Sequence, residues 1–299
     1  MSISALIILF VFGLAAGSFI NVVALRYNVG GKLFAASVLS GRSLCPKCGR
    51  SLRWFELIPL VSFFIQRARC RSCGEKISWR YPLVEILAGL IFVYTPLRLE
   101  EAFQVWRFAE TMRHPIWFYI LAGLWIGALL ILLLIALIDF RTYIIPDSLN
   151  VSLLIIGLLV ILTQSYYDLF GLMTGTFVSH HALLFGLRSS LWGNHFIALF
   201  LGLLLFGGIV LFTRGRGMGL GDVKLISVLG FLFGWPDILL IIFYSFVIGA
   251  IIALFIMALG RKKFKDVIPF GPFIAIGAAL TVFFGLETLT SYFSIFPIA

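Results

Sequence analysis

Apolar residues occur along the chain in long blocks that are separated by short polar or charged connections. Eight of these blocks approach the roughly 20 apolar residues that a helix needs to cross a lipid bilayer. They cover residues 4–24, 82–98, 116–138, 148–166, 195–213, 223–236, 238–259 and 272–294. The pattern predicts an all-α polytopic membrane protein with about eight transmembrane helices, of which the second and sixth are the shortest.

The overall composition supports this prediction and excludes several other classes of protein. Of the 299 residues, 61% are hydrophobic and 12% are charged, whereas a typical soluble domain is about 25% charged. Such a chain is too apolar for a disordered protein or an ordinary soluble enzyme. The four cysteines are also too few for a scaffold held together by disulfide bonds.

The first apolar block ends in small residues, a feature that is also typical of cleaved signal peptides. A signal peptide, however, begins with a basic segment, and here the basic residue Arg26 follows the block. We therefore expect residues 1–24 to form a retained transmembrane helix with its N-terminus outside the cytoplasm.

The uneven distribution of basic residues predicts the orientation in the membrane. With eight spans, both termini lie outside, and 19 of the 23 lysines and arginines then lie on the cytoplasmic side, in agreement with the positive-inside rule. Residues 25–81 alone hold eleven basic and two acidic residues, which accounts for nearly all of the net charge of +10. We expect this cytoplasmic loop to bind anionic membrane lipid or an acidic part of a protein partner, and the charge no longer suggests nucleic acid as a partner.

The basic loop contains two Cys-x-x-Cys pairs that are separated by 21 residues, Cys45 with Cys48 and Cys70 with Cys73. Each pair offers two thiolates from one tight turn, and two such turns complete the tetrahedral ligand set of a zinc ribbon. Disulfide bonds, a redox pair or free thiols are alternatives, although a reducing cytoplasm disfavours disulfides. We favour a structural zinc ion, because a loop of this size has too small a core to fold alone.

These features predict three parts of the chain. Residues 1–24 are the first transmembrane helix, residues 25–81 are a small cytoplasmic domain that resembles a zinc ribbon, and residues 82–299 are a membrane-embedded domain. The cysteine-bearing domain thus lies between the first and second transmembrane helices.

Four acidic residues lie within or beside apolar blocks, where burial of a charge is costly and therefore indicates function. They are Glu85, Asp139, Asp147 and Asp222. Asp139 ends one apolar block and Asp222 begins another, and the predicted topology places both near the cytoplasmic face. Two such acids could share one proton, so that one activates water while the other protonates the scissile carbonyl oxygen, as in aspartic proteases.

Asp222 follows a run with glycine at every second position, Gly217, Gly219 and Gly221. Glycine has no side chain, so this run would let the backbone of a substrate approach the acid closely. The run is not a phosphate-binding loop, because it lacks the Gly-x-x-x-x-Gly-Lys-Ser/Thr pattern.

Each acid also has a purely structural interpretation. Asp147 is favoured as the N-cap of the helix that follows it, and a cap is an alternative for Asp222 as well. Asp139 and Glu85 could instead pair with nearby arginines. We favour Asp139 and Asp222 as the catalytic pair and keep Asp147 and Glu85 as candidates for a supporting role.

In combination, these segments resemble the type IV prepilin peptidase family. The resemblance is carried, in order over almost the whole chain, by residues 17–23, the cysteine loop as it runs on into residues 77–85, the two segments around Asp139 and Asp222, and residues 269–273. The Gly-x-Gly-Asp motif alone would also fit presenilin-like intramembrane proteases. The cysteine loop decides in favour of the prepilin peptidases.

The resemblance implies that Asp139 and Asp222 are the catalytic pair of a bacterial inner-membrane enzyme. Its substrate would be a prepilin or pseudopilin, whose short basic leader is cut at the cytoplasmic face of the membrane. The resemblance also implies N-methylation of the new N-terminus with S-adenosylmethionine as donor, an activity associated with the cysteine loop. No motif in the sequence indicates a site for this cofactor, so the expectation depends on the resemblance alone.

Two other functions are alternatives. A proton-coupled transporter would show internally related halves with acids near mid-span, and no such repeat is seen. The second alternative function is that of a zinc-stabilised scaffold protein in a pilus or secretion system. Residues 167–194 form a longer outer connection than the resemblance implies and could hold a re-entrant segment.

Overall fold

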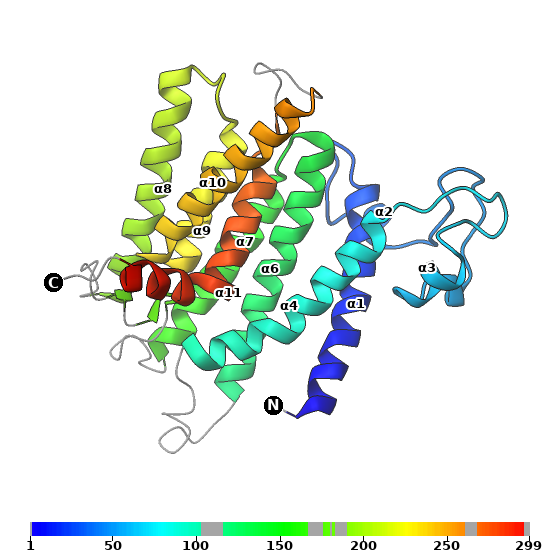
Figure 1. The fold of residues 1–299 in the computed structure, drawn as a ribbon, viewed down its shortest axis with the longest axis horizontal. Coiled ribbons are helices and arrows are strands. Elements are labelled where there is room, and N and C mark those ends of the chain that lie inside the picture. The colour runs from blue at the N-terminus through cyan, green and yellow to red at the C-terminus, as the bar shows by residue number, and fades with distance from the viewer. Residues whose placement is uncertain are drawn as a thin grey trace. The chain divides into compact units, whose positions relative to one another are not determined.

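The structure, a computed structural model, is helical and confirms the expected all-α membrane architecture (Figure 1). It describes residues 2–102, 116–166, 176–179, 181–182, 190–260 and 268–295. Most of the connection at residues 167–194 lies outside this description. Among the described residues, seven helices are long and apolar enough to cross a membrane. The chain divides into two compact units, Met1–Pro96 and Leu97–Ala299.

The first unit is built on the long helices α1 (Ile3–Arg26) and α4 (Arg80–Ala102), of which α4 continues into the second unit. The two helices approach each other closely because α1 has small residues at the contact. A side chain at Gly17, for example, would lie 2.7 Å from the Cα atom of Glu85 in α4. Small residues permit this close backbone packing, which is a common way for membrane helices to associate.

Three short helical segments lie between α1 and α4 and form the cysteine-bearing region. They are α2 (Ala36–Leu39), the 3-10 helix η1 (Trp54–Glu56) and α3 (Val61–Ile65). Arg26, the last residue of α1, ties this region to the membrane helix, since its guanidinium donates a hydrogen bond of 2.6 Å to the carbonyl oxygen of Ser40. This hydrogen bond therefore fixes the position of the segment around Ser40 relative to the end of α1.

Among the described residues of the second unit lie six further helices. In chain order they are α6 (Ile116–Thr142), α7 (Asp147–Tyr166), α8 (Leu191–Thr213), α9 (Leu220–Phe233), α10 (Asp237–Ala258) and α11 (Gly271–Ile295). Helix α9 packs against α7 and α8, while α11 packs against α6 and α10. Figure 1 shows these helices as one bundle, coloured from green through red.

Helix α9 differs from the transmembrane span expected at residues 223–236. It has 14 residues, which gives a length of about 21 Å, too short for a hydrocarbon core of about 30 Å. Its neighbours enclose it closely, because a side chain at Gly202 of α8 would lie 3.0 Å from the carbonyl oxygen of Ile226. The helix ends at Gly234, whose φ of 78° favours glycine. Helix α9 is thus a short helix buried among longer ones.

Candidate active site and four-cysteine cluster

Asp139 lies in the last turn of α6 and is 4% exposed. Its Oδ2 atom accepts a hydrogen bond of 3.0 Å from the backbone N–H of Gly271, the first residue of α11. The N-terminus of a helix carries unpaired N–H groups and a partial positive charge, so it attracts a carboxylate. The beginning of α11 therefore holds the Asp139 carboxylate in place.

Asp222 lies in the first turn of α9 and is 9% exposed. Its Oδ2 atom accepts a hydrogen bond of 3.3 Å from the backbone N–H of Gly219, the residue that precedes the helix. This is the bond that an acidic residue makes to the N-cap in a capping box. The structural interpretation of Asp222 as a cap thus describes a real contact, but it does not explain why the carboxylate is buried.

The connection between α6 and α7 brings the two acids to the same end of the second unit. Ile145, in this connection, lies 3.4 Å from the position that a side chain at Gly221 would occupy and 3.3 Å from the corresponding position at Gly271. Gly221 directly precedes Asp222 in the chain, and Gly271 donates the hydrogen bond to Asp139. The charge of Asp139 acts on Asp222, so the two carboxylates lie within electrostatic range of each other.

Two buried carboxylates in electrostatic range can act together as a general acid and a general base. In a medium of low polarity, repulsion between like charges disfavours the state in which both are ionised. A state with one proton between them then provides a base and an acid in the same place. This arrangement can activate a water molecule and protonate a carbonyl oxygen in one reaction.

The three glycines of the predicted substrate-approach loop have different surroundings. A side chain at Gly217 would lie 2.9 Å from Thr213 at the end of α8, away from both acids. The corresponding position at Gly219 is 3.5 Å from Oδ2 of Asp222, and that at Gly221 faces Ile145. Gly219 is therefore the member of the run whose missing side chain keeps the space beside the carboxylate open.

Asp147, at the beginning of α7, forms an ion pair with Lys224 in the first turns of α9. Its Oδ1 atom lies 2.8 Å from Nζ of Lys224, two residues beyond Asp222, and the two side chains are 71% and 55% exposed. Helix α7 begins at Asp147 itself, so the predicted cap residue lies in the first helical turn. Exposed ion pairs contribute about 0–1 kcal/mol, and Asp147 therefore belongs to the rim of the site.

Glu85 lies in the first unit and has structural contacts there. It is 7% exposed, and its Oε2 atom accepts a hydrogen bond of 2.8 Å from the backbone N–H of Leu60. Leu60 has a φ of 58°, a conformation that costs a residue with a side chain about 1–3 kcal/mol. Glu85 thus holds a strained turn of the cysteine-bearing region against α4.

Two further buried or contacting residues, Gly271 and Asn150, have no local sequence signal of a role. Gly271 lies in one of the segments that carry the family resemblance, but nothing local indicated that it contacts Asp139. Asn150 in α7 is 5% exposed, and among the described residues neither of its amide atoms has a hydrogen-bond partner. A buried group of this kind costs about 1–3 kcal/mol. The only signal in the sequence was a polar residue at the start of an apolar block.

The four cysteines converge in the first unit as their spacing predicted. The Sγ atoms of Cys45, Cys48, Cys70 and Cys73 all lie within 4.8 Å of one another, and those of Cys45 and Cys73 are 3.9 Å apart. Four thiolates around a tetrahedral zinc ion, at Zn–S distances of about 2.3 Å, lie about 3.8 Å apart. All four thiols are free, so the cluster fits a metal ion and does not contain a disulfide bond.

The backbone of each Cys-x-x-Cys turn favours the thiolate form that binds metal. The N–H groups of Cys73 and Ser72 point toward the sulfur of Cys70 and lower the pKa of this thiol to about 6. Gly49 and Gly74, which follow the two pairs, have φ values of 67° and 70°, where glycine is favoured. Thiolates are the metal-binding form of cysteine, so the backbone N–H groups around Cys70 favour a ligand role for this residue.

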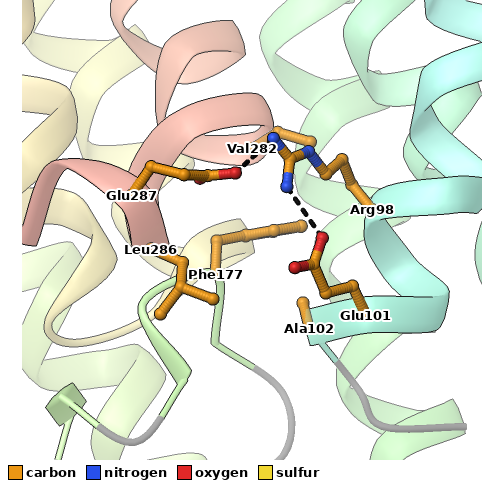
Figure 2. Close-up of a pocket in the computed structure, with 7 residues that line it drawn as sticks. All are labelled: Arg98, Glu101, Ala102, Phe177, Val282, Leu286 and Glu287. Carbon is orange, nitrogen blue, oxygen red and sulfur yellow. Dashed lines mark hydrogen bonds and ion pairs between the residues drawn. The ribbon is translucent and has the colours of Figure 1, made fainter. Parts of the chain in front are cut away.

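A small pocket in the second unit contains none of these residues (Figure 2). Arg98 is one of the residues that line it, with an ion pair of 2.7 Å to Glu101 and a second ion pair to Glu287 of α11. Phe177 and Leu286 form part of the apolar wall. The cavity of about 10 Å³ has room for about one water molecule, so this feature is a packed ionic contact and not a substrate site.

Comparison with known proteins gives two matches to family profiles. Residues 11–99 match the bacterial peptidase A24 N-terminal domain, and residues 125–254 match the type IV leader peptidase family. The first match includes the four-cysteine cluster, and the second includes both Asp139 and Asp222. No solved structure matches the chain.

Similar proteins share most of their length with this chain. A protein of Burkholderia pseudomallei is 33% identical, and the alignment covers 92% of this chain and 84% of the relative. Proteins of Pseudomonas aeruginosa and Bacillus subtilis are 31% and 29% identical over 94% and 95% of this chain, and over 90% and 96% of their own lengths. All three relatives carry the name prepilin leader peptidase/N-methyltransferase.

Proposed function

Because this chain belongs to the type IV leader peptidase family, we propose that Asp139 and Asp222 are the catalytic residues of its peptidase reaction. The protein is a multi-pass membrane enzyme that acts as a prepilin leader peptidase and N-methyltransferase. The observation that supports the catalytic assignment is the pair of buried carboxylates within electrostatic range at one end of the second unit. Each carboxylate accepts a hydrogen bond from the backbone of a glycine.

We infer the following course for hydrolysis of the leader by this pair. The ionised carboxylate of the pair takes a proton from a water molecule, whose oxygen attacks the carbonyl carbon of the scissile peptide bond. The protonated carboxylate donates its proton to the carbonyl oxygen. Collapse of the tetrahedral intermediate breaks the C–N bond as a proton passes to the leaving amine, and the proton between the carboxylates is restored. Gly219 leaves the space in which the peptide backbone approaches Asp222.

We place this reaction at the cytoplasmic face of the inner membrane. Basic residues gather at the end of the unit where the acids lie, with Arg141 close to Asp139 in the chain and Arg214 and Arg216 before the glycine run. A surplus of lysine and arginine is typical of cytoplasmic loops. The basic leader of a prepilin would then reach the acids without crossing the membrane.

We assign the four-cysteine cluster a structural zinc ion that orders the region between α1 and α4. Four cysteine ligands close the coordination shell, which is typical of structural zinc sites and leaves no open position for catalysis. We expect S-adenosylmethionine to be the methyl donor for the new N-terminus. None of the described residues is assigned to this cofactor.

The proposed function is tested directly by incubating the purified full-length chain with a prepilin in proteoliposomes. Mass spectrometry of the pilin should show loss of the leader and, when S-adenosylmethionine is present, one additional methyl group at the new N-terminus. An uncut prepilin would contradict the function. Proton transport in the same vesicles without cleavage would instead favour the transporter alternative.

Replacement of Gly271 by alanine is expected to lower the rate of leader cleavage by about 100-fold. The added Cβ atom would lie 2.7 Å from Oδ2 of Asp139, so the carboxylate or the beginning of α11 must move. A displacement of about 1 Å in a catalytic geometry typically costs a factor of this size. The rate should be measured with membrane-embedded prepilin, and thermal unfolding should be recorded in parallel.

Gly208 in α8 provides the matched control for this substitution. A side chain there would meet no atom within 4 Å, so Gly208→Ala should cleave the leader at the wild-type rate. If Gly271→Ala also cleaves at the wild-type rate, the proposed support of Asp139 by α11 is wrong.

A further inference from the structure

The cysteine-bearing region exposes a cluster of large aromatic side chains. Phe64 and Trp79 are 61% and 68% exposed, and their ring centroids are 6.4 Å apart. Both rings pack on the buried Phe63, whose centroid lies 4.9 Å from that of Trp79. Ile65, next to Phe64, is 65% exposed. Contiguous apolar groups of this kind on a surface usually mark a site of interaction with a protein or a membrane.

The position of this cluster in the chain favours the membrane. Trp79 directly precedes Arg80, the first residue of α4, which is one of the helices long enough to cross a bilayer. Tryptophan is enriched where a transmembrane helix enters the bilayer, because its ring is apolar and its N–H group can remain hydrated. Leu83, one turn further into α4, is 57% exposed and continues the apolar surface toward the hydrocarbon.

Exposed basic side chains accompany the aromatic cluster. An antiparallel bridge pairs Arg69 with Lys76, and Ile77 donates a hydrogen bond of 2.7 Å to the carbonyl oxygen of Ala68. These contacts hold the segment that carries Arg67 and Arg69 beside the segment that leads to Trp79. Within the described ranges, neither arginine forms an ion pair, and nor does Lys76.

The acidic residues of the region do not neutralise these basic side chains. Glu56 is buried and lies 3.2 Å from the guanidinium of Arg50. Glu75 forms an ion pair with Lys47. Both acids of residues 25–81 are therefore already paired, so within this segment no free acid opposes the positive charge beside the aromatic cluster.

We propose that this aromatic–basic surface, formed by Phe64, Ile65, Arg67, Arg69, Lys76 and Trp79, docks onto the cytoplasmic leaflet of the membrane and binds anionic lipid headgroups. The aromatic rings lie at the level of the headgroups, and the basic side chains contact lipid phosphates. Apolar burial combined with attraction to anionic lipid is the mode by which peripheral segments bind membranes. Docking would hold the four-cysteine cluster beside the membrane surface, which the proposed peptidase chemistry does not require.

The test follows the Trp79 side chain in the full-length chain. The protein is labelled with 5-fluorotryptophan and placed in nanodiscs that contain phosphatidylcholine with increasing fractions of phosphatidylglycerol, and Trp79→Phe identifies the fluorine resonance. We expect lipid with a nitroxide near the headgroup to broaden this resonance as the anionic fraction increases. A water-soluble paramagnetic reagent should broaden the same resonance less as the anionic fraction increases.

Charge variants distinguish anionic lipid from a purely apolar contact. Arg67→Gln combined with Arg69→Gln should lower the ratio of docked to free Trp79 by about 25-fold, since one basic residue near an anionic surface contributes a factor of about five. Arg42→Gln combined with Arg53→Gln removes the same charge from exposed residues outside the surface and should have a smaller effect. The proposal is overturned if the soluble reagent broadens Trp79 at every lipid composition. It is also overturned if both reagents fail to reach Trp79, because another protein segment then covers the surface.

Discussion

Replacement of Asp222 by asparagine is expected to reduce leader cleavage by about 1,000-fold, within the range typical of a lost general acid or base. Asparagine has nearly the same size and can still accept the hydrogen bond that Gly219 donates to Asp222. It can neither take a proton from water nor donate one to the carbonyl oxygen. The same result is expected for Asp139→Asn, whose amide oxygen can still accept from Gly271.

Asp147→Asn is the control that separates catalysis from surface charge. This acid lies beside the site in an exposed ion pair with Lys224, which contributes at most about 1 kcal/mol. We expect a change in the cleavage rate of no more than about five-fold. Comparable losses in Asp147→Asn and Asp222→Asn, measured under single-turnover conditions with embedded prepilin, would contradict the assignment of the catalytic pair.

Replacement of Cys73 by serine is expected to release the metal ion and to unfold the region between α1 and α4. Metal binding stabilises such domains by about 10–16 kcal/mol, far more than the small core of this loop can supply. Methylation, which the family resemblance associates with the cysteine loop, should be lost, while leader cleavage by the second unit continues. Metal analysis and hydrogen exchange of the backbone amides around Cys45 and Cys70 measure the two structural effects.

Ser72→Ala is the matched control, because this residue lies in the same turn as Cys73 but offers no ligand to the cluster. It should retain about one metal ion per chain and the amide protection of the wild type. A Cys73→Ser protein that keeps its metal and its protection would show that the cluster is not the zinc site we assign.

The membrane helices and the cysteine cluster could be predicted because both depend on local patterns. Long apolar blocks identify helices that cross a bilayer, and paired Cys-x-x-Cys turns identify a ligand set before any fold is known. Helix α9 shows the limit of this reasoning. An apolar run of this length is the same in sequence whether lipid or other helices surround it, and only the packing around Ile226 shows that it is a short enclosed helix.

The hydrogen bonds that hold Asp139 and Glu85 could not be predicted from the sequence, and the reason differs from that for α9. The predicted topology placed Asp139 and Asp222 at one membrane face, which was sufficient to pair them as candidates. The hydrogen bond from Gly271 to Asp139 joins residues 132 positions apart, and the contact of Glu85 with Leu60 depends on a strained turn. Contacts of this kind arise from tertiary packing, and no periodicity or motif encodes them in a single sequence.

The central claim is that Asp139 and Asp222 act as one catalytic unit, and a double-mutant cycle tests it most directly. Single-turnover cleavage of embedded prepilin should be measured for the wild type, for Asp139→Asn, for Asp222→Asn and for the protein with both substitutions. Residues that act as a unit have strongly non-additive effects, so the double variant should lose about the same 1,000-fold as each single variant. A loss equal to the product of the single effects, or a wild-type rate in either single variant, would contradict the claim.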